Sequence, residues 1–300
     1  MSAVATSTVR STIAMDTAIS VEALGDVDPA QLERALGWFH EVETHCTRFD
    51  AVSELSRLCA RPGVSVVVSD LLFRAVEFAL AVAEESSGAF DPTIGGALQR
   101  RGFDRNYRTG GQIAAAAADP AATFRDVYLD PASHAITLLR PLSLDLGAVA
   151  KGLAIDLAAA ELAGLTNFAI SAGGDLRLAG HNADGAPWQV GIRNPAAPTE
   201  LMTVLSISDA AVCTSAGNER PAPDGGNHIT DPATGESPAS ALSVTVVAPT
   251  AMVADAFATA AFVLGPRAGL AFLERNGAEG LIATPTLDIH TTSGFARFLA

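Results

Sequence analysis

The sequence predicts an α+β fold built from mostly antiparallel sheets with helices packed on them. Alternating apolar and polar segments predict several short strands, and one pair of them, 128–130 and 135–139, reads as a hairpin closed by residues 131–134. Helical segments occur singly between such hairpins, without the regular strand–helix alternation of a doubly wound parallel sheet. These two observations favour the α+β class.

Taken in order, the chain begins with an expected flexible segment, residues 1–14, followed by a strand over 15–24. Asp28 and Pro29 suit the N-cap and first turn of a helix that runs to about Thr47. Further expectations are a loop at 48–58, a β-branched segment at 64–68, a helix from 69 or 70 to about 88, a loop at 88–96, a peripheral segment at 99–120, a strand that enters a helix over 142–164, and strands at 168–171, 188–192, 203–207, 211–214 and 242–247.

Composition limits the class of protein. The chain has 300 residues, 49% of them apolar, and we expect a single domain over 15–300 with two lobes. A formal net charge of −14 argues against a nucleic-acid partner and against anionic membrane surfaces. Three scattered cysteines predict neither a disulfide framework nor a zinc site. No secretory leader and no membrane span are recognised, so a cytoplasmic location is expected.

An internal echo suggests a possible duplication within the fold. Residues 91–95 and 231–235 both start with Asp-Pro and both contain a threonine shortly before a glycine. Two short matches in a chain rich in glycine and proline support a duplicated half-domain only weakly.

Asp255 is unusual because it lies in an otherwise apolar helix. Thr250 suits the N-cap of that helix, and Gly265 followed by Pro266 suits its end. Thr259 lies one turn after Asp255, so a carboxylate and a hydroxyl share a helix face, which is half of a hard-cation site. The alternative is a buried aspartate that caps a neighbouring backbone or pairs with an arginine.

The turn over 145–152 has features of an anion site. Gly147 permits a close backbone approach, and the helix that follows offers unpaired N–H groups to a phosphate. Lys151 adds a cation in the first turn of this helix, although it could instead extend to solvent. The turn lacks the spacing of a Walker A loop.

Two other polar segments are weaker candidates for a functional site. The sequence 173–175 follows a strand but lacks the dinucleotide fingerprint, which excludes a nicotinamide oxidoreductase reading, and Asp175 reads as a turn cap. His228, near Asp231, could act as a general base. Ser171 and Ser215 lack the nucleophile elbow of serine hydrolases.

Together these segments resemble the FAD:protein FMN transferase family, also called ApbE. The matching stretches occur in the family's order and extend over nearly the whole chain. They are 15–17, 53–58, 88–95, 145–152 with Asp156, 172–175, 214–215, 228–235 and 254–259.

This resemblance implies a T-fold-like α+β domain that binds FAD and a divalent cation, usually magnesium. It implies transfer of the FMN moiety to a Thr or Ser hydroxyl of a target flavoprotein, with AMP as the leaving group. Asp255, Thr259 and the backbone oxygen of Ala148 match the family's metal ligands, and His228 and Asp255 are the expected catalytic residues. The positions that match FAD contacts are Met15, Ala89, Phe90, Asp91, Asp145, Lys151 and Ile229.

The chain departs from the family pattern near these motifs, and the segment over 214–219 lacks the aromatic residue that often follows Thr-Ser-Gly in the family. Asp16 stands where glycine is common, and Phe49 and Cys59 stand where tyrosine and asparagine are usual. Two other activities remain compatible with the same residues: a metal-dependent FAD pyrophosphatase, which releases FMN and AMP, and an FAD-binding protein without turnover. They differ from the transferase in what reaches the phosphorus atom: water or nothing, instead of a protein hydroxyl.

Overall fold

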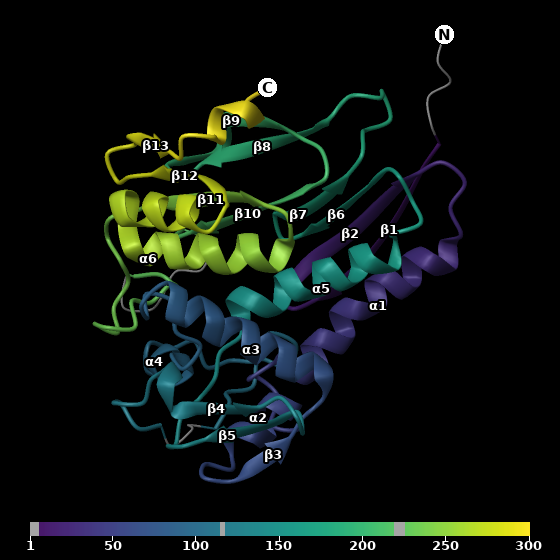
Figure 1. Ribbon diagram of the computed structural model, residues 1–300. Coiled ribbons are helices and arrows are strands. Elements are labelled where there is room, and N and C mark those ends of the chain that lie inside the picture. Colours follow the sequence, from purple (N-terminus) through teal and green to yellow (C-terminus); the bar gives the residue numbers. More distant parts are fainter. Residues whose placement is uncertain (1–5, 115–117, 219–225) are drawn as a thin grey trace. The chain divides into compact units, whose positions relative to one another are not determined.

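The computed structural model describes residues 6–114, 118–218 and 226–300, and its mixture of helices with antiparallel sheets confirms the α+β class (Figure 1). The chain forms two compact units. The first comprises Met1–His40, Lys151–Ala216 and Ser240–Ala300, and the second comprises Glu41–Ala150 and Gly217–Ala239. Within the expected peripheral segment 99–120, residues 115–117 lie outside the described residues.

An eight-stranded sheet organises the first unit. Its strand order is β1-β2-β6-β7-β10-β11-β12-β13, and each neighbouring pair is antiparallel. The strands are β1 Ser7–Ala14, β2 Thr17–Leu24, β6 Phe168–Ala172, β7 Asp175–Ala179, β10 Ala210–Ala216, β11 Ser243–Ala248, β12 Glu279–Ala283 and β13 Ile289–Thr291.

Both faces of this sheet are covered near its centre. The burial of every residue of β11 shows this, since successive side chains point to opposite faces. Helix α6, Ala251–Arg275, packs on one face, against β10, β11 and β12. The hairpin of β8, Trp188–Asn194, and β9, Ala197–Ile207, lies over the other face with the short helix η2, Phe295–Phe298 (Figure 1). Their shared core consists of Leu178, Val190, Ile192, Leu205, Ile207, Val212, Val247, Leu281 and Phe295.

Helix α6 consists of two segments. Thr250 caps its start, since the Thr250 hydroxyl accepts a hydrogen bond from the N–H of Val253 at 3.4 Å. Gly265 has φ 75° and ends the first segment as predicted. The prediction did not include the second segment, which begins at Pro266, where a fixed φ suits the first turn of a helix.

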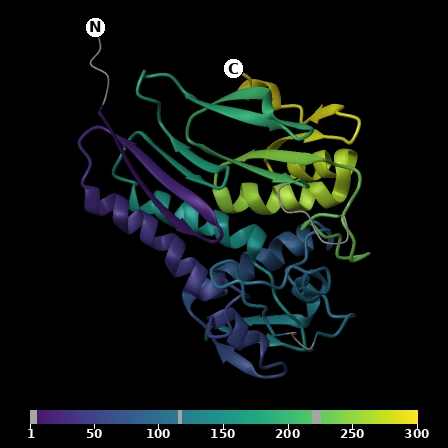
Figure 2. The ribbon, with the colours of Figure 1, turned by 180° about the vertical axis from the view of Figure 1, so that it is seen from behind.

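The N-terminal prediction was wrong for residues 7–14, which we expected to be flexible. They form β1, paired along its length with β2, because Thr8, Val9, Thr12 and Ile13 are β-branched residues, which suit an extended strand. The hairpin, purple in Figure 2, lies at one edge of the sheet. Met15 and Asp16 form its turn, so the expected strand starts at Thr17. Residues 1–5 lie outside the described residues.

The second unit contains a three-stranded sheet and short helices. The predicted hairpin is confirmed as β4 and β5, and Ser69 caps α3 as expected. The loop predicted over 48–58 was wrong in part, because the Ser53 hydroxyl accepts the Ser56 N–H at 3.0 Å and caps α2. The elements are α2 Glu54–Cys59, β3 Ser65–Val67, α3 Asp70–Glu85, α4 Gly95–Arg100, η1 Phe124–Asp126, β4 Val127–Asp130 and β5 Ala135–Leu138.

Two long helices continue from one unit into the other along the chain: α1, Pro29–Cys46, which matches its prediction, and α5, Gly147–Glu161. Cys46, Cys59 and Cys213 are free thiols, as expected. Among the described helices, α6 alone is long and apolar enough to cross a membrane. More than half of its most apolar window is buried in the protein, and buried core helices meet the same criterion.

The internal echo has a local explanation. In both copies the aspartate forms an Asx turn: Asp91 accepts the N–H of Thr93 at 2.8 Å, and Asp231 accepts that of Ala233 at 2.9 Å. The first copy leads into α4, whereas the second continues as a turn. Shared turn chemistry therefore accounts for the similarity, and the duplication stays a prediction.

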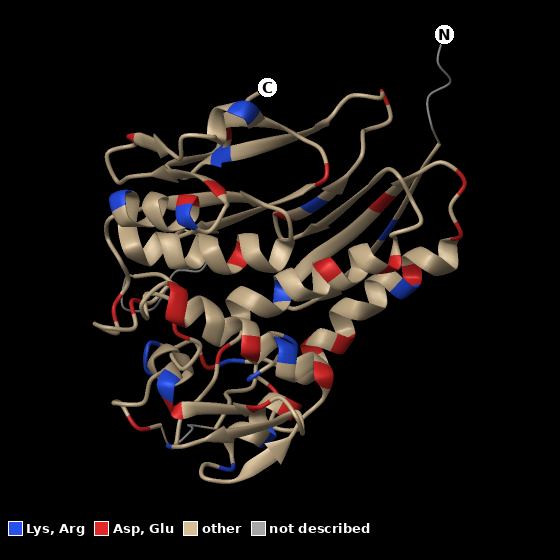
Figure 3. Ribbon diagram, in the orientation of Figure 1, with Lys and Arg blue, Asp and Glu red and all other residues tan. Residues whose placement is uncertain are grey.

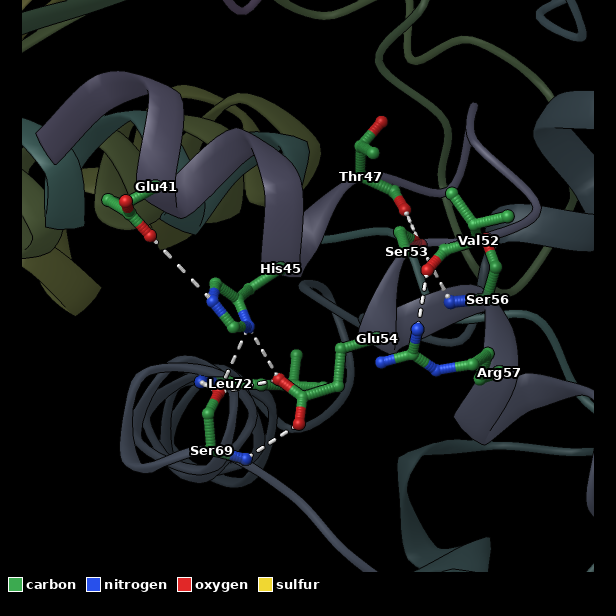
Figure 4. A network of polar contacts seen from close by, with 10 residues as sticks. All are labelled: Glu41, His45, Thr47, Val52, Ser53, Glu54, Ser56, Arg57, Ser69 and Leu72. Atoms are coloured by element: carbon green, nitrogen blue, oxygen red, sulfur yellow. Dashed lines mark hydrogen bonds and ion pairs between the residues drawn. The ribbon is translucent and has the colours of Figure 1, made fainter. Parts of the chain in front are cut away.

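A polar network joins the end of α1 to α2 and α3 (Figure 4). Glu54 accepts hydrogen bonds from the Ser69 hydroxyl at 2.5 Å and the Ser69 N–H at 2.7 Å, and it lies 2.8 Å from His45 Nδ1. Burial raises the pKa of Glu54, but the bonds from Ser69 and His45 outweigh it, so the pKa lies below its usual 4.5. The ionised carboxylate therefore stabilises the fold.

We expect Glu54→Gln to lower the free energy of unfolding by about 2 kcal/mol at pH 7, because charge-assisted hydrogen bonds are lost. Since the folded pKa is lowered, the stabilisation is present above pH 4.5 and is lost as pH falls through the folded pKa. Urea unfolding from pH 3 to 7 measures both effects. Glu77→Gln, at an exposed position of α3, is the control; equal losses in both variants would contradict the role of Glu54.

Candidate active site

In the first unit, three charged side chains gather where α5 meets β7 and α6. Lys151 of α5 forms an ion pair with Asp175, the first residue of β7. Asp175 is 2% exposed, and its other oxygen accepts the N–H of Thr214 at 3.1 Å. The residue that we interpreted as a turn cap is therefore a buried counter-ion that fixes Lys151.

Asp255 lies on the first segment of α6 and is 7% exposed. It is the single charged residue of that segment, which is otherwise uncoloured in Figure 3. Its Oδ2 is buried and has no hydrogen-bond partner among the described residues. With Lys151 paired to Asp175, the cluster carries one uncompensated negative charge.

The electrostatics of the cluster agree with this count. Burial raises the pKa of Asp255; Lys151 lowers it, Asp175 raises it further, and the Gly152 N–H lowers it, so the net shift is strongly upward. For Lys151, burial lowers the pKa, but the two carboxylates outweigh burial and raise it. Lys151 therefore stays charged, and Asp255 is the carboxylate with an oxygen, Oδ2, that lacks a hydrogen-bond partner among the described residues.

A threonine hydroxyl lies one helical turn after Asp255, and a serine hydroxyl of β10 lies beside it. Thr259, one turn after Asp255 on α6, is half-buried, and its Oγ1 lies 3.2 Å from Ser215 Oγ on β10. Among the described residues, no cluster of three or more His, Cys, Asp or Glu could hold a metal. One carboxylate with hydroxyl oxygens instead fits magnesium, which typically keeps waters and binds substrate phosphates.

Close packing of α5 on α6 fixes this arrangement. A Cβ on Gly152 would lie 2.5 Å from Met252 Cα, so only glycine permits the helices to approach this closely. Four residues on, the Asp156 carboxylate accepts the N–H groups of Ala251 at 2.8 Å and Met252 at 2.9 Å. Asp156 thereby satisfies two of the unpaired donors at the start of α6.

Two tight turns lie side by side in the same unit. Gly173 and Gly174 connect β6 to β7 with positive φ, and a Cβ on Gly173 would lie 2.5 Å from Thr17 Oγ1. Thr17 follows the turn of Met15 and Asp16, where φ is 53° and 62°. Positive φ at both central residues is the geometry of a two-residue type I′ hairpin turn, in which aspartate is common and methionine is not. The turn that contains Met15, an expected FAD contact, thus lies beside the turn that precedes Asp175.

In the second unit, the structure brings two expected FAD-binding segments together. The Asp145 N–H donates to the Pro92 carbonyl at 2.7 Å, which joins the turn before α5 to the loop of Ala89, Phe90 and Asp91. Asp91 is buried, and its oxygens accept bonds from Thr93 and from the Phe124 N–H. Burial raises the pKa of Asp91, and the bonds from Thr93 only partly offset this. Its side chain therefore holds the loop.

His228 and Ile229 lie in the loop that follows the undescribed residues 219–225, and Ile229 is buried. Arg101, at the end of α4, holds this loop: its guanidinium donates to Thr230 Oγ1 at 2.6 Å and to Ser237 Oγ at 2.8 Å. Ser237 Oγ also bonds the backbone of Asn227, at 2.8 and 2.9 Å. Arg101 therefore sets the path of the backbone on both sides of His228.

The expected site residues divide between the units. Lys151, Asp255, Thr259 and Met15 lie in the first unit. The other expected FAD contacts lie in the second unit: Ala89, Phe90, Asp91, Asp145 and Ile229. Ala148 and His228 also belong to the second unit, Ala148 in the first turn of α5.

Sequence reasoning missed Asp175, Arg48 and Arg101. Arg48 forms a buried ion pair with Asp145. For Asp175, the sequence did contain a signal. This acidic residue directly follows two glycines, and apolar residues, Ala172 and Leu176, flank the three. The arginines have no such signal, because their partners are 97 and 129 residues away in the sequence.

Comparison with known proteins identifies the relatives of this chain. The model of the ApbE family matches residues 15–282. A Treponema pallidum protein named FAD:protein FMN transferase is 35% identical over 278 residues, covering 81% of this chain and 74% of its own. A Vibrio cholerae protein of the same name is 29% identical, with 87% and 82% covered.

Solved structures agree in fold. The ApbE protein of Thermotoga maritima has a TM-score of 0.87 at 27% identity, covering 98% of this chain and all of its own. The flavin transferase ApbE of Vibrio cholerae gives 0.87 at 26% identity with the same coverage. The expected resemblance is thereby confirmed, and the chain belongs to the ApbE family of transferase enzymes.

Proposed function

We propose that this protein is a magnesium-dependent FAD:protein FMN transferase, which moves FMN from FAD to a Thr or Ser hydroxyl of a target flavoprotein and releases AMP. The observation that carries the proposal is the buried carboxylate of Asp255, whose Oδ2 lacks a partner among the described residues. Membership of the ApbE family and the names of its relatives support flavin transfer. The cytoplasmic location stays a prediction.

The metal ligands in this proposal are Asp255, Thr259 and the backbone oxygen of Ala148. A carboxylate, a hydroxyl and a carbonyl are all hard oxygen donors of the kind that magnesium prefers. Bound there, the cation would act as a Lewis acid and neutralise charge on the pyrophosphate of FAD. Asp175 and Asp156 contribute indirectly, since they hold Lys151 and the start of α6.

The transfer step itself is a substitution at phosphorus. The acceptor hydroxyl oxygen forms a bond to the phosphorus of the FMN half, and the bond from that phosphorus to the bridging oxygen breaks, so that AMP leaves. We propose that His228 takes the proton of the hydroxyl and that Lys151 donates a hydrogen bond to the pyrophosphate. Met15, Ala89, Phe90, Asp91, Asp145 and Ile229 are proposed to position FAD.

A second candidate function uses the same residues. If water replaces the acceptor hydroxyl, the products are FMN and AMP, and the protein is an FAD pyrophosphatase. The metal-site residues are equally suited to both reactions. A binding protein without turnover is less favoured, because Asp255, Thr259 and their supporting contacts are all present.

The first prediction of the proposed function concerns the products. Incubated with FAD, magnesium and a flavoprotein domain that carries an acceptor threonine, the protein should add one FMN to that domain and release one AMP. Intact-mass spectrometry of the acceptor and chromatography of AMP measure both products, and EDTA should abolish both. The control is the acceptor with Thr replaced by Val. AMP release without an adduct would favour the pyrophosphatase, and FAD that is bound but unchanged would contradict enzymatic function.

The second prediction concerns the metal. Asp255→Asn should abolish magnesium-dependent turnover, yet should not lower the Tm without metal, because it removes an uncompensated buried charge. Magnesium should raise the Tm of the unaltered protein but not of this variant. Scanning calorimetry and AMP assays measure these effects.

Thr259 offers a matched pair for the same site. Thr259→Ser keeps the hydroxyl and should retain most activity, whereas Thr259→Val keeps the shape and should lose about tenfold or more in magnesium affinity. Full magnesium dependence in Asp255→Asn, or equal behaviour of the two Thr259 variants, would rule out this site.

The third prediction concerns the His228 loop. Arg101→Met removes both hydrogen bonds to the loop and should lower kcat/KM by about tenfold to a hundredfold, because a misplaced group near the reaction is costly. Steady-state kinetics of AMP release measure the loss. The control is Arg100→Met, at the exposed neighbouring position. If both variants behave alike, Arg101 does not position the loop.

A further inference from the structure

Arg48 lies between α1 and α2 in the second unit, with its side chain 6% exposed. Two of its three guanidinium nitrogens are engaged: Nε in the ion pair with Asp145, and Nη2 as donor to the Phe103 carbonyl at 2.8 Å. The guanidinium carbon lies 4.1 Å from the centre of the Phe49 ring. The group is therefore held rigidly on several sides.

The third nitrogen, Nη1, is buried and has no hydrogen-bond partner among the described residues. Buried N–H groups are paired in nearly all folded proteins, so an unpaired one at a rigid, buried site calls for an acceptor from outside the described residues. Asp145, the ion-pair partner, is bonded to the Pro92 carbonyl at 2.7 Å. Arg48 thus contacts Asp145 directly, and the backbone N–H of Asp145 links it to the loop that holds Ala89, Phe90 and Asp91.

Charge indicates what kind of atom Nη1 would contact. Burial raises the pKa of Asp145, but the adjacent Arg48 outweighs burial and lowers it, so the carboxylate stays ionised. The two opposite charges cancel. A neutralised guanidinium still donates a directional hydrogen bond, yet it attracts an anion only weakly. An uncharged acceptor therefore fits better than a phosphate oxygen.

We propose that Arg48 Nη1 donates a hydrogen bond to an uncharged acceptor of bound FAD, a ring carbonyl, ring nitrogen or hydroxyl, and is a binding residue for this substrate. This inference rests on the proposed function, because it takes FAD as the ligand. It assigns recognition of the uncharged parts of the dinucleotide to a residue outside the expected site.

The variant that tests this is Arg48→Lys, which keeps the charge beside Asp145 but has no second nitrogen to occupy the place of Nη1. FAD binding, measured by flavin fluorescence, should weaken about tenfold, the worth of one hydrogen bond to a charged donor. Riboflavin and adenosine lack phosphate, and the affinity of the variant for one of the two should fall by a similar factor. Inorganic pyrophosphate should bind both proteins equally, and added salt should not change the ratio for FAD.

Arg125→Lys is the matched control, because Arg125 also stacks on a phenylalanine, at 4.3 Å from Phe124, and pairs with an acidic residue, but is exposed. Unchanged FAD affinity in Arg48→Lys would overturn the inference. So would a loss confined to ligands with phosphate. If the unaltered protein transfers FMN while Arg48→Lys binds FAD normally, the inference alone fails; if the unaltered protein does not bind FAD, the proposed function fails with it.

Should Arg48→Lys not fold, the unaltered protein provides a second test. After [15N]arginine labelling, the guanidinium N–H signals of a buried, ion-paired arginine are resolved from exposed ones by slow exchange with water. Adding riboflavin or adenosine should shift these signals, and the absence of a shift at saturation with both and with FAD would overturn the inference.

Discussion

The first unit depends on one electrostatic constraint: a carboxylate buried in an apolar helix without a counter-charge of its own. Lys151 could neutralise Asp255, but it forms its ion pair with Asp175 instead. Burying an unpaired charge is costly, so the surrounding elements must hold Asp255 in place against that cost. The tight packing at Gly152 and the cap that Asp156 supplies to α6 both do so. The fold therefore keeps one buried carboxylate oxygen, Asp255 Oδ2, without a hydrogen-bond partner among the described residues, at a cost in stability.

In the second unit, the polar side chains of the proposed FAD-binding loops form hydrogen bonds with other residues of the same unit. Asp91 accepts bonds from its own loop and from Phe124, and Arg101 is bonded to the two hydroxyls that frame the His228 loop. Such contacts make the loops rigid before a substrate arrives, which lowers the entropy lost on binding. Against this background the unpaired Nη1 of Arg48 stands out, because its neighbours in the same network are paired.

The parts of the structure that were predicted correctly are those that depend on local sequence patterns. Capping residues and periodicity correctly placed α1, α3 and the first segment of α6, and alternation placed the hairpin of β4 and β5. The strand β1 was missed because the start of the chain is rich in Ser, Thr and Ala, a composition that resembles a flexible segment. In the site, Asp255 and Thr259 were identified from helical spacing, whereas Arg48 and Arg101 act through partners distant in sequence, which no local pattern encodes.

The pairing of Lys151 with Asp175 changes how the positive charge of the site must be understood. From the sequence, Lys151 is a cation that stabilises pyrophosphate. In the structure its charge is matched by Asp175, and its side chain is 25% exposed, so what it offers a ligand is a hydrogen-bond donor with little net charge. Asp145 matches Arg48 in the same way. In a protein with a net charge of −14, we therefore propose that the reaction depends on a divalent cation to neutralise the pyrophosphate. Asp255, with its unpaired Oδ2, is the carboxylate that we propose as its ligand.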